Sequence, residues 1–246
     1  MMIKNTLFIS LILFSFFCSA QTTTTSTVSK TPGPLNESSI VRGEDGLVYP
    51  YNVWQALMRT GKYSIRSRNT KTEKGEPEYL LVELSAQQRK ELSDRMPKPR
   101  PSDSFKEGEI FKGFKVSDIN GNKFDLRTNT GKVIVLNFWF INCPPCKAEI
   151  PELNELVKDY GENKDVLFLA VALDTKSEIK DFLKTNPYNY NIIDDARFIA
   201  DKYGVRSYPT HVVIDKTGTI RFSTVGLAFN TISYIKKSID EALNTK

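Results

Sequence analysis

The sequence predicts an α/β domain whose mixed central sheet is covered by helices on both faces. Two runs of apolar, β-branched and aromatic residues, 133–140 and 166–173, have the composition of strands that are buried on both sides. Helical patterns alternate with these runs, as in strand-helix-strand units with parallel strands. Two later runs, 205–215 and 220–225, flank a Gly-containing turn and predict an antiparallel pair.

The other elements of this domain follow from shorter signals. Alternating residues on either side of Asn120-Gly121 predict an N-terminal β-hairpin over residues 114–126. Apolar residues at helical spacing after the first buried strand predict a helix that ends at Gly161. Similar signals predict a helix over 177–183 capped by Ser177, an edge strand over 190–193, a helix over 196–203 that stops at Gly204, and an amphipathic helix over 231–243.

The N-terminal end has a different composition. Residues 1–20 combine Lys4, an apolar run over 7–17 and a small-residue stretch before Gln21, which is the layout of a cleaved signal peptide. We therefore expect an exported, periplasmic protein. Lipidation at Cys18 is the less favoured alternative, because two phenylalanines rather than small residues precede this cysteine.

The next part of the chain predicts a second, smaller unit. Residues 21–35 are rich in Thr, Ser and Pro and predict a flexible tether. Residues 36–95 predict a small α+β module of unknown role. Alternate prolines in residues 96–104 predict a stiff linker. The main domain is then expected to span residues 105–246.

Three elements are expected within the small module. They are a short helix within 53–58, a strand over 79–84 and a helix capped by Ser85. Six basic residues between Arg59 and Lys74 predict a solvated loop rather than a site for an anionic ligand. The whole chain has 34 basic and 29 acidic residues, well mixed, so we expect no nucleic-acid partner.

Two cysteines lie where the first buried strand meets its helix. The first backbone N–H groups of a helix have no partner and carry partial positive charge, so a Cys143 thiolate there would be stabilised. Cys146 lies one turn further on, within reach for a disulfide. So small a loop adds little stability, which indicates a reactive pair.

Other uses of a Cys-x-x-Cys pair fit less well. A zinc site needs two more ligands, and His211 is the only further His or Cys of the mature chain. Haem attachment needs His where Lys147 stands. We therefore predict a dithiol redox centre with no metal and no cofactor.

Three separated motifs carry a resemblance to the thioredoxin superfamily. They are Phe138-Trp139 followed by Cys143-Pro144-Pro145-Cys146, then Glu149-Ile150-Pro151, and finally the segment from Tyr203 to Thr210. Within that superfamily, this redoxin-type chain resembles the exported TlpA-like thiol-disulfide oxidoreductases, which include the cytochrome c maturation reductases. The resemblance covers about residues 105–246, and it implies a thioredoxin-like fold.

The resemblance also implies roles for four catalytic residues. Cys143 would attack a substrate disulfide and Cys146 would resolve the mixed disulfide, leaving a Cys143–Cys146 redox disulfide. Glu149 would be partly buried and exchange protons with the cysteines. The Tyr208-Pro209 bond would be cis and face the cysteines, because proline is otherwise poorly placed to open an apolar strand.

Residues around these groups are expected to bind the substrate, and two positions depart from the family pattern. The expected substrate-binding residues are Trp139, Asn142, Pro144, Pro145, Tyr208 and Thr210. Asn137 stands where thioredoxins carry a buried aspartate, and Asn142 replaces a common aromatic residue. His211 shows no charge partner in the sequence and is predicted to be structural or on the surface.

The function predicted from these features is reduction of protein disulfides by an exported enzyme that contributes to cell redox homeostasis. Its partners would be a disulfide-containing protein substrate and a membrane-bound thiol electron donor. One alternative is a peroxiredoxin-type thiol peroxidase, although Phe140 stands where such enzymes carry Thr. Another is a partner-binding scaffold. The sequence leaves the direction of electron flow open.

Overall fold

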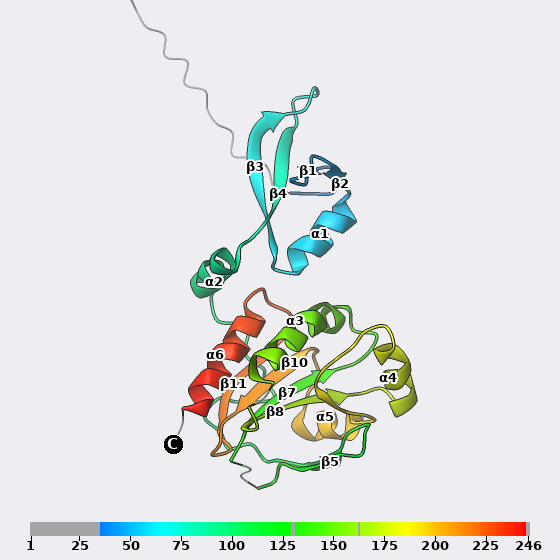
Figure 1. Cartoon of the computed structure of the whole chain (residues 1–246), viewed down its shortest axis with the longest axis vertical. Coiled ribbons are helices and arrows are strands. Elements are labelled where there is room, and N and C mark those ends of the chain that lie inside the picture. The colour runs from blue at the N-terminus through cyan, green and yellow to red at the C-terminus, as the bar shows by residue number, and fades with distance from the viewer. Residues whose placement is uncertain (1–34, 129–130, 162, 245–246) are drawn as a thin grey trace, which may run out of the picture. The chain divides into compact units, whose positions relative to one another are not determined.

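The computed structural model describes residues 35–128, 131–161 and 163–244 (Figure 1). The predicted signal peptide and residues 21–34 of the predicted tether lie outside this range, so these predictions stand untested. No helix in the described ranges has the length and apolar character needed to cross a membrane.

A five-stranded sheet forms the centre of the main domain. Its strand order is β11-β10-β7-β8-β9, and the bounds are β7 (Val133–Trp139), β8 (Val166–Ala172), β9 (Asn191–Ile193), β10 (Thr210–Ile214) and β11 (Ile220–Val225). β7, β8 and β9 are parallel, whereas β10 is antiparallel to both β7 and β11. The predicted mixed sheet is therefore confirmed. The predicted hairpin is also present, as β5 (Lys115–Ser117) and β6 (Lys123–Asp125).

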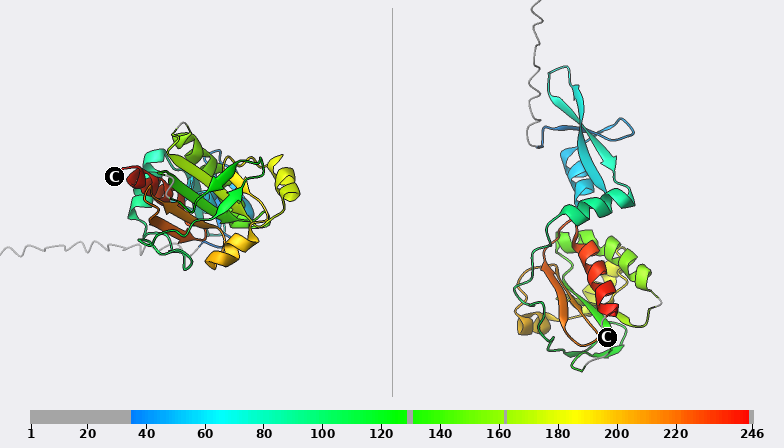
Figure 2. Two further views of the ribbon diagram at one scale, coloured as in Figure 1. Left: turned by 90° about the horizontal axis from the view of Figure 1, so that it is seen from below. Right: turned by 90° about the vertical axis from the view of Figure 1, so that its left-hand side faces the viewer.

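Helices cover the two faces of this sheet. α3 (Pro144–Tyr160), α4 (Lys176–Leu183) and α6 (Thr231–Leu243) contribute to one core cluster, and α5 (Arg197–Tyr203) contributes to the other. Figure 2 shows α3 and α6 on one side of the strands and α5 on the opposite side. Residues 105–126 complete the layer on the α5 side with Phe105, Phe111 and Phe114.

β7 occupies the middle of the sheet, and all seven of its residues are buried. Its apolar side chains alternate between the two cores, with Val135 in the first and Leu136 in the second. Asn137 is the one polar residue of this strand and is 1% exposed. A buried amide needs hydrogen-bond partners, so polar groups are expected next to the Asn137 side chain.

Two boundaries of the predicted elements are wrong. Thr175, not Ser177, caps α4, because the Thr175 hydroxyl accepts from the Glu178 N–H and the Glu178 carboxylate accepts from the Thr175 N–H. The predicted strand over 205–215 begins only at Thr210. Pro209 has no N–H to donate to a neighbouring strand, so regular pairing starts after it.

Asp215 closes the turn between β10 and β11. Its carboxylate accepts from the N–H groups of Thr217 and Thr219, both at 2.9 Å, and from Arg221 Nε at 2.6 Å. Burial opposes the charge, but these hydrogen bonds outweigh burial and hold the pKa of Asp215 below its ordinary value.

The predicted small module contains both helices and strands, and its standing as a separate unit remains a prediction. Its elements are β1 (Ile40–Arg42), β2 (Val48–Tyr49), α1 (Tyr51–Arg59), β3 (Tyr63–Lys71), β4 (Pro77–Glu83) and α2 (Ala86–Arg95), with sheet order β2-β1-β4-β3. Ser85 caps α2 in a capping box with Gln88, which confirms the predicted cap. The loop predicted between Arg59 and Lys74 is wrong, because β3 runs through it. β3 is exposed from Arg66 onward, so no alternation of apolar residues marks it in the sequence.

The proline-rich segment 96–104 is hydrogen-bonded to the main domain. The carbonyl of Pro97 accepts from Asn230 Nδ2 at 3.0 Å, and the carbonyl of Arg100 accepts from the Val225 N–H at 3.1 Å. Ser104 Oγ donates to the carbonyl of Gly204 at 2.9 Å. These bonds hold the segment along the domain that it precedes. Its role as a domain boundary remains a prediction.

Candidate active site

The two cysteines form a disulfide at the N-terminus of α3, as predicted. Cys143 is the N-cap residue, and the backbone N–H of Cys146 points at its sulfur, with N and Sγ 3.3 Å apart. Both cysteines are buried, with 3% of Cys143 and 1% of Cys146 exposed. A Cys143 thiolate formed by reduction would therefore sit at the positive end of the helix dipole with an N–H donor already in place.

Asp174, which follows the end of β8, fixes the loop before Cys143. The Ile141 N–H donates to Asp174 Oδ2 at 2.8 Å, and the Cys143 N–H donates to the Phe140 carbonyl at 3.2 Å. Burial raises the pKa of Asp174 above its ordinary value, although the bond from Ile141 works in the other direction. Asp174 thus fixes the loop that leads to the disulfide, although burial disfavours its charged form.

The Tyr208-Pro209 peptide bond is cis, which confirms the prediction. Thr210 pairs with Phe138 across the β10–β7 ladder, so Pro209 lies level with the end of β7 from which the cysteine loop departs. Tyr208 is half-buried and packs edge-on against Phe140, with ring centroids 5.3 Å apart. The proline turn and the cysteine loop therefore meet at the same edge of the sheet.

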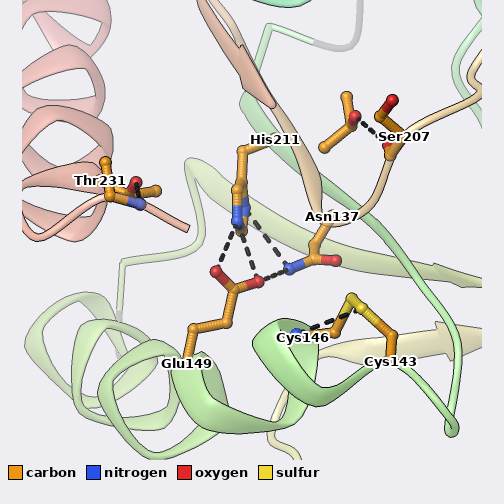
Figure 3. Close-up of polar contacts among 9 residues, drawn as sticks. Asn137, Cys143, Cys146, Glu149, Ser207, His211 and Thr231 are labelled. Atoms are coloured by element: carbon orange, nitrogen blue, oxygen red, sulfur yellow. Dashed lines mark hydrogen bonds and ion pairs between the residues drawn. A yellow bond between two sulfur atoms is a disulfide. The ribbon is translucent and has the colours of Figure 1, made fainter. Parts of the chain in front are cut away.

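A buried polar network lies beside the disulfide (Figure 3). Glu149 is 2% exposed, and its Oε1 accepts from Asn137 Nδ2 at 2.9 Å. His211 Nε2 lies 3.0 Å from Glu149 Oε1 and 3.1 Å from Oε2. The second ring nitrogen, Nδ1, lies 3.4 Å from Asn137 Nδ2. Three residues from α3, β7 and β10 thus converge within one hydrogen-bonded group.

Of the two predicted places for His211, the surface is wrong, and the structure shows the buried position. The residue is 0% exposed, so it is not on the surface, and it has a charge partner in Glu149. Its position is set by the β10–β7 ladder, in which His211 is the direct partner of Asn137. The polar Asn137 within an apolar strand was a signal that some polar partner lay opposite, but the sequence did not say which residue it was.

Two tyrosines face the same network from the segment just before β9. Tyr188 and Tyr190 are buried, and neither hydroxyl has a hydrogen-bond partner among the described residues. Burial, and after it the negative charge of Glu149, raise the pKa of Tyr190 well above its ordinary value. Both phenols therefore stay protonated and add no charge beside Glu149.

The predicted substrate-binding residues fall into two groups. Trp139 and Thr210 are each 1% exposed, so direct contact of these side chains with a protein substrate is not supported. Trp139 packs against Phe182 and Tyr188 instead, and the Thr210 hydroxyl donates to the Ser207 carbonyl at 2.8 Å. The remaining residues form an accessible rim around the disulfide. They are Asn142 and Pro144, which are exposed, and Pro145 and Tyr208, which are partly exposed.

No ligand set for a metal is apparent in the described ranges. Nowhere in them do three or more His, Cys, Asp or Glu side chains come together in a way that could hold an ion. The chemistry that the site offers is therefore that of the two sulfurs, with Glu149 and His211 beside them.

Comparison with known proteins places this chain in a family. The sequence profile described as the AhpC/TSA family matches residues 108–223. Thioredoxin-like protein YneN of Bacillus subtilis is 30% identical over 142 residues, which cover 57% of this chain and 80% of that protein. Thiol-disulfide oxidoreductase ResA of Bacillus thuringiensis is 33% identical over 120 residues, which cover 48% of this chain and 69% of that protein. The chain belongs to the ResA-like thiol-disulfide oxidoreductases of the thioredoxin superfamily.

A solved structure supports the same assignment. A Chlorobium tepidum protein assigned as the thiol:disulfide interchange protein DsbE matches with a TM-score of 0.51 and 27% identity, over 57% of this chain and 99% of that one. This ResA-like chain is therefore a thiol-disulfide oxidoreductase with a thioredoxin-like fold, and the cysteine pair at the start of α3 is the group in it suited to that chemistry.

Proposed function

We propose that this protein is an exported reductase of protein disulfides that works through the Cys143-Pro144-Pro145-Cys146 dithiol. The observation that carries the proposal is the disulfide at the N-terminus of α3, with the Cys146 N–H directed at Cys143 Sγ. That geometry favours Cys143 as the attacking thiolate, because the helix dipole and the N–H both stabilise negative charge on its sulfur.

The roles of the other residues follow from their positions. Cys146 resolves the mixed disulfide, since it is the sulfur already within bonding distance of Cys143. Glu149 accepts the proton that Cys146 loses. Tyr208 lies on the rim, where its backbone pairs with an extended segment of the substrate, and the buried Pro209 fixes the turn next to it. Asn142, Pro144 and Pro145 supply the surface that the substrate contacts.

Export and partners are part of the same proposal. The signal-peptide pattern in residues 1–20 supports a periplasmic location. In that compartment the cytosolic glutathione pool is out of reach, so a membrane-bound thiol donor would return the disulfide to the dithiol. The similarity to ResA supports a substrate that is itself a disulfide-containing protein.

The reduction potential of the Cys143–Cys146 pair tests the direction of electron flow. Equilibration with glutathione or dithiothreitol buffers gives this value for the purified protein. A potential at or below about −250 mV, near that of thioredoxin, supports a reductase. A potential near about −120 mV would mean an oxidant that introduces disulfides.

The two alternatives have separate tests. A peroxidase would consume hydrogen peroxide with the pure protein and a thiol reductant, and Phe140 in place of Thr predicts no such turnover. A scaffold protein would keep its cellular role in a Cys143→Ser variant. The reductase proposal predicts that this variant is inactive in cells although it folds.

A further inference from the structure

His211 takes no part in the thiol-disulfide exchange itself, yet it belongs to the buried polar network beside the disulfide. It is the only histidine of the chain, it is fully buried, and its closest polar neighbours are Glu149 and Asn137. A buried imidazole that faces a buried carboxylate is costly to desolvate unless every donor and acceptor is matched. The hydrogen bonds around it therefore define its protonation.

One arrangement of protons follows from the orientation of the Asn137 amide. The Asn137 amide nitrogen has two N–H groups, and it lies 2.9 Å from Glu149 Oε1 and 3.4 Å from His211 Nδ1. With one N–H directed to each, Nδ1 is an acceptor, and the ring proton sits on Nε2, which donates to the Glu149 carboxylate. Every one of these contacts is satisfied when His211 is neutral and Glu149 is ionised.

The same three residues have a place for one more proton. Asn137 Oδ1 is buried and has no hydrogen-bond partner among the described residues. If the amide turns by half a rotation, Oδ1 replaces Nδ2 and accepts a proton newly carried by Nδ1 or by the carboxyl group. The Glu149–His211 pair carries one negative charge before this change and none after it.

The groups around the pair within the described residues are mostly uncharged. The titratable groups that face it are Cys146 and Glu152 on α3, and Tyr188 and Tyr190, whose phenols stay protonated. Thr224 is the strand partner of His211 on β11. The buried face of α6 is uncharged and consists of Thr231, Ile235, Ser238, Ile239 and Ala242.

We propose that His211 is a positioning residue that orients Glu149 and shares with it the proton released by Cys146. The inference rests on the proposed thiol-disulfide exchange at Cys143 and Cys146. It adds that the Glu149–His211 pair holds the proton of Cys146 while the disulfide exists. When Cys146 resolves a mixed disulfide, its proton passes to the pair and its sulfur bonds to Cys143 Sγ. The bond from Cys143 to the substrate sulfur breaks, and the substrate leaves as a thiolate with that electron pair. When a donor dithiol later reduces the Cys143–Cys146 bond, the departing Cys146 thiolate takes the proton back.

The single histidine makes the proposal directly measurable. Ring ¹⁵N resonances of His211, followed over pH in the disulfide and dithiol forms, need no substrate and no assignment among several histidines. We expect the neutral form to carry its proton on Nε2 and the titration midpoint to differ between the two redox states. A ring that titrates identically in both states, or that never gains a proton or a change of hydrogen bonding on oxidation, would overturn the proposal.

A variant adds a kinetic readout. His211→Gln keeps an N–H donor for Glu149 but takes no proton, so resolution of a mixed disulfide on Cys143 should slow by about 10- to 100-fold at neutral pH. The loss should shrink at alkaline pH, where Cys146 ionises unaided. Val212→Ala is the matched control, because Val212 is equally buried on β10 but belongs to the opposite core.

These outcomes separate the inference from the proposed function. The control should lose stability but keep the wild-type pH profile of resolution. A wild-type profile in His211→Gln would leave His211 with a structural role only and overturn the inference. A redox-linked His211 titration in a protein that fails to reduce protein disulfides would instead contradict the reductase proposal.

Discussion

Replacing Glu149 by glutamine should change the stability of the fold little but slow the resolution of a mixed disulfide strongly. Oε1 of Glu149 accepts both from Asn137 Nδ2 at 2.9 Å and from His211 Nε2 at 3.0 Å. An amide oxygen in the same place keeps both bonds, although each weakens from a charge-assisted to a neutral one. The expected loss of unfolding free energy is therefore small, about 1–2 kcal/mol.

A leucine at the same position gives the contrasting stability. Glu149→Leu leaves the buried N–H groups of Asn137 and His211 without an acceptor, and each unpaired donor costs about 1–3 kcal/mol. Relief from burying a carboxylate offsets part of this cost, so the total should be about 2–5 kcal/mol. Urea unfolding of the two oxidised variants at neutral pH measures both values.

The chemical effect should be much larger than the effect on folding. Without the carboxylate, Cys146 loses the charged proton acceptor of the Glu149–His211 pair, and general base catalysis typically contributes about 10²–10⁴-fold. The assay is release of thionitrobenzoate from a mixed disulfide on Cys143, followed by absorbance in single-turnover experiments. Glu149→Gln should regain rate above about pH 8.5, where an ordinary thiol ionises without help.

A matched acid on the same helix provides the control. Glu155 is exposed on α3, and its carboxylate pairs with Lys158 at 2.7 Å, so Glu155→Gln should resolve the mixed disulfide at the wild-type rate. If Glu149→Gln also resolved it at the wild-type rate near neutral pH, Glu149 would not be the proton acceptor. The reasoning from burial and hydrogen bonding to catalysis would then be wrong.

Three further predictions concern the cysteines and two carboxyl groups. Cys146→Ser cannot resolve a mixed disulfide, so protein substrates should accumulate on Cys143 and be visible on non-reducing gels. A variant with both Cys143→Ser and Cys146→Ser should accumulate none. Burial raises the pKa of Asp174, so the stability it contributes is present at low pH and is lost as pH rises through that raised value. Asp174→Asn should therefore be more stable than wild type at neutral pH, with the difference vanishing below about pH 4, and urea midpoints over pH would contradict this if the two curves ran parallel. Asp215→Ala should cost about 3 kcal/mol of unfolding free energy, because several donors lose a charged acceptor. The lowered pKa of Asp215 means that its contribution is present above the ordinary aspartate pKa and is lost as pH falls through the lower folded value, so wild type and variant should converge in strong acid.

Most of the main domain could be predicted because its signals are local. The apolar run of β7, the Asn120-Gly121 turn of the hairpin and the stop of α5 at Gly204, which has a φ of 70°, each depend on residues adjacent in the chain. The cysteine pair was equally plain, since the strand, the two sulfurs and the start of the helix are contiguous. β3 was missed because its pairing with β4, and not its own alternation, makes it a strand.

The local sequence was enough to place two cysteines at a strand-to-helix junction in a mixed α/β domain. What lies beside these cysteines depends on the tertiary structure. Glu149 is 12 residues from Asn137, and His211 is 62 residues from Glu149 and 74 from Asn137. Their contact depends on the antiparallel register of β10 against β7 and on the face that α3 turns to the sheet. Register and packing arise from the whole set of buried side chains, so no short stretch of the sequence contains them.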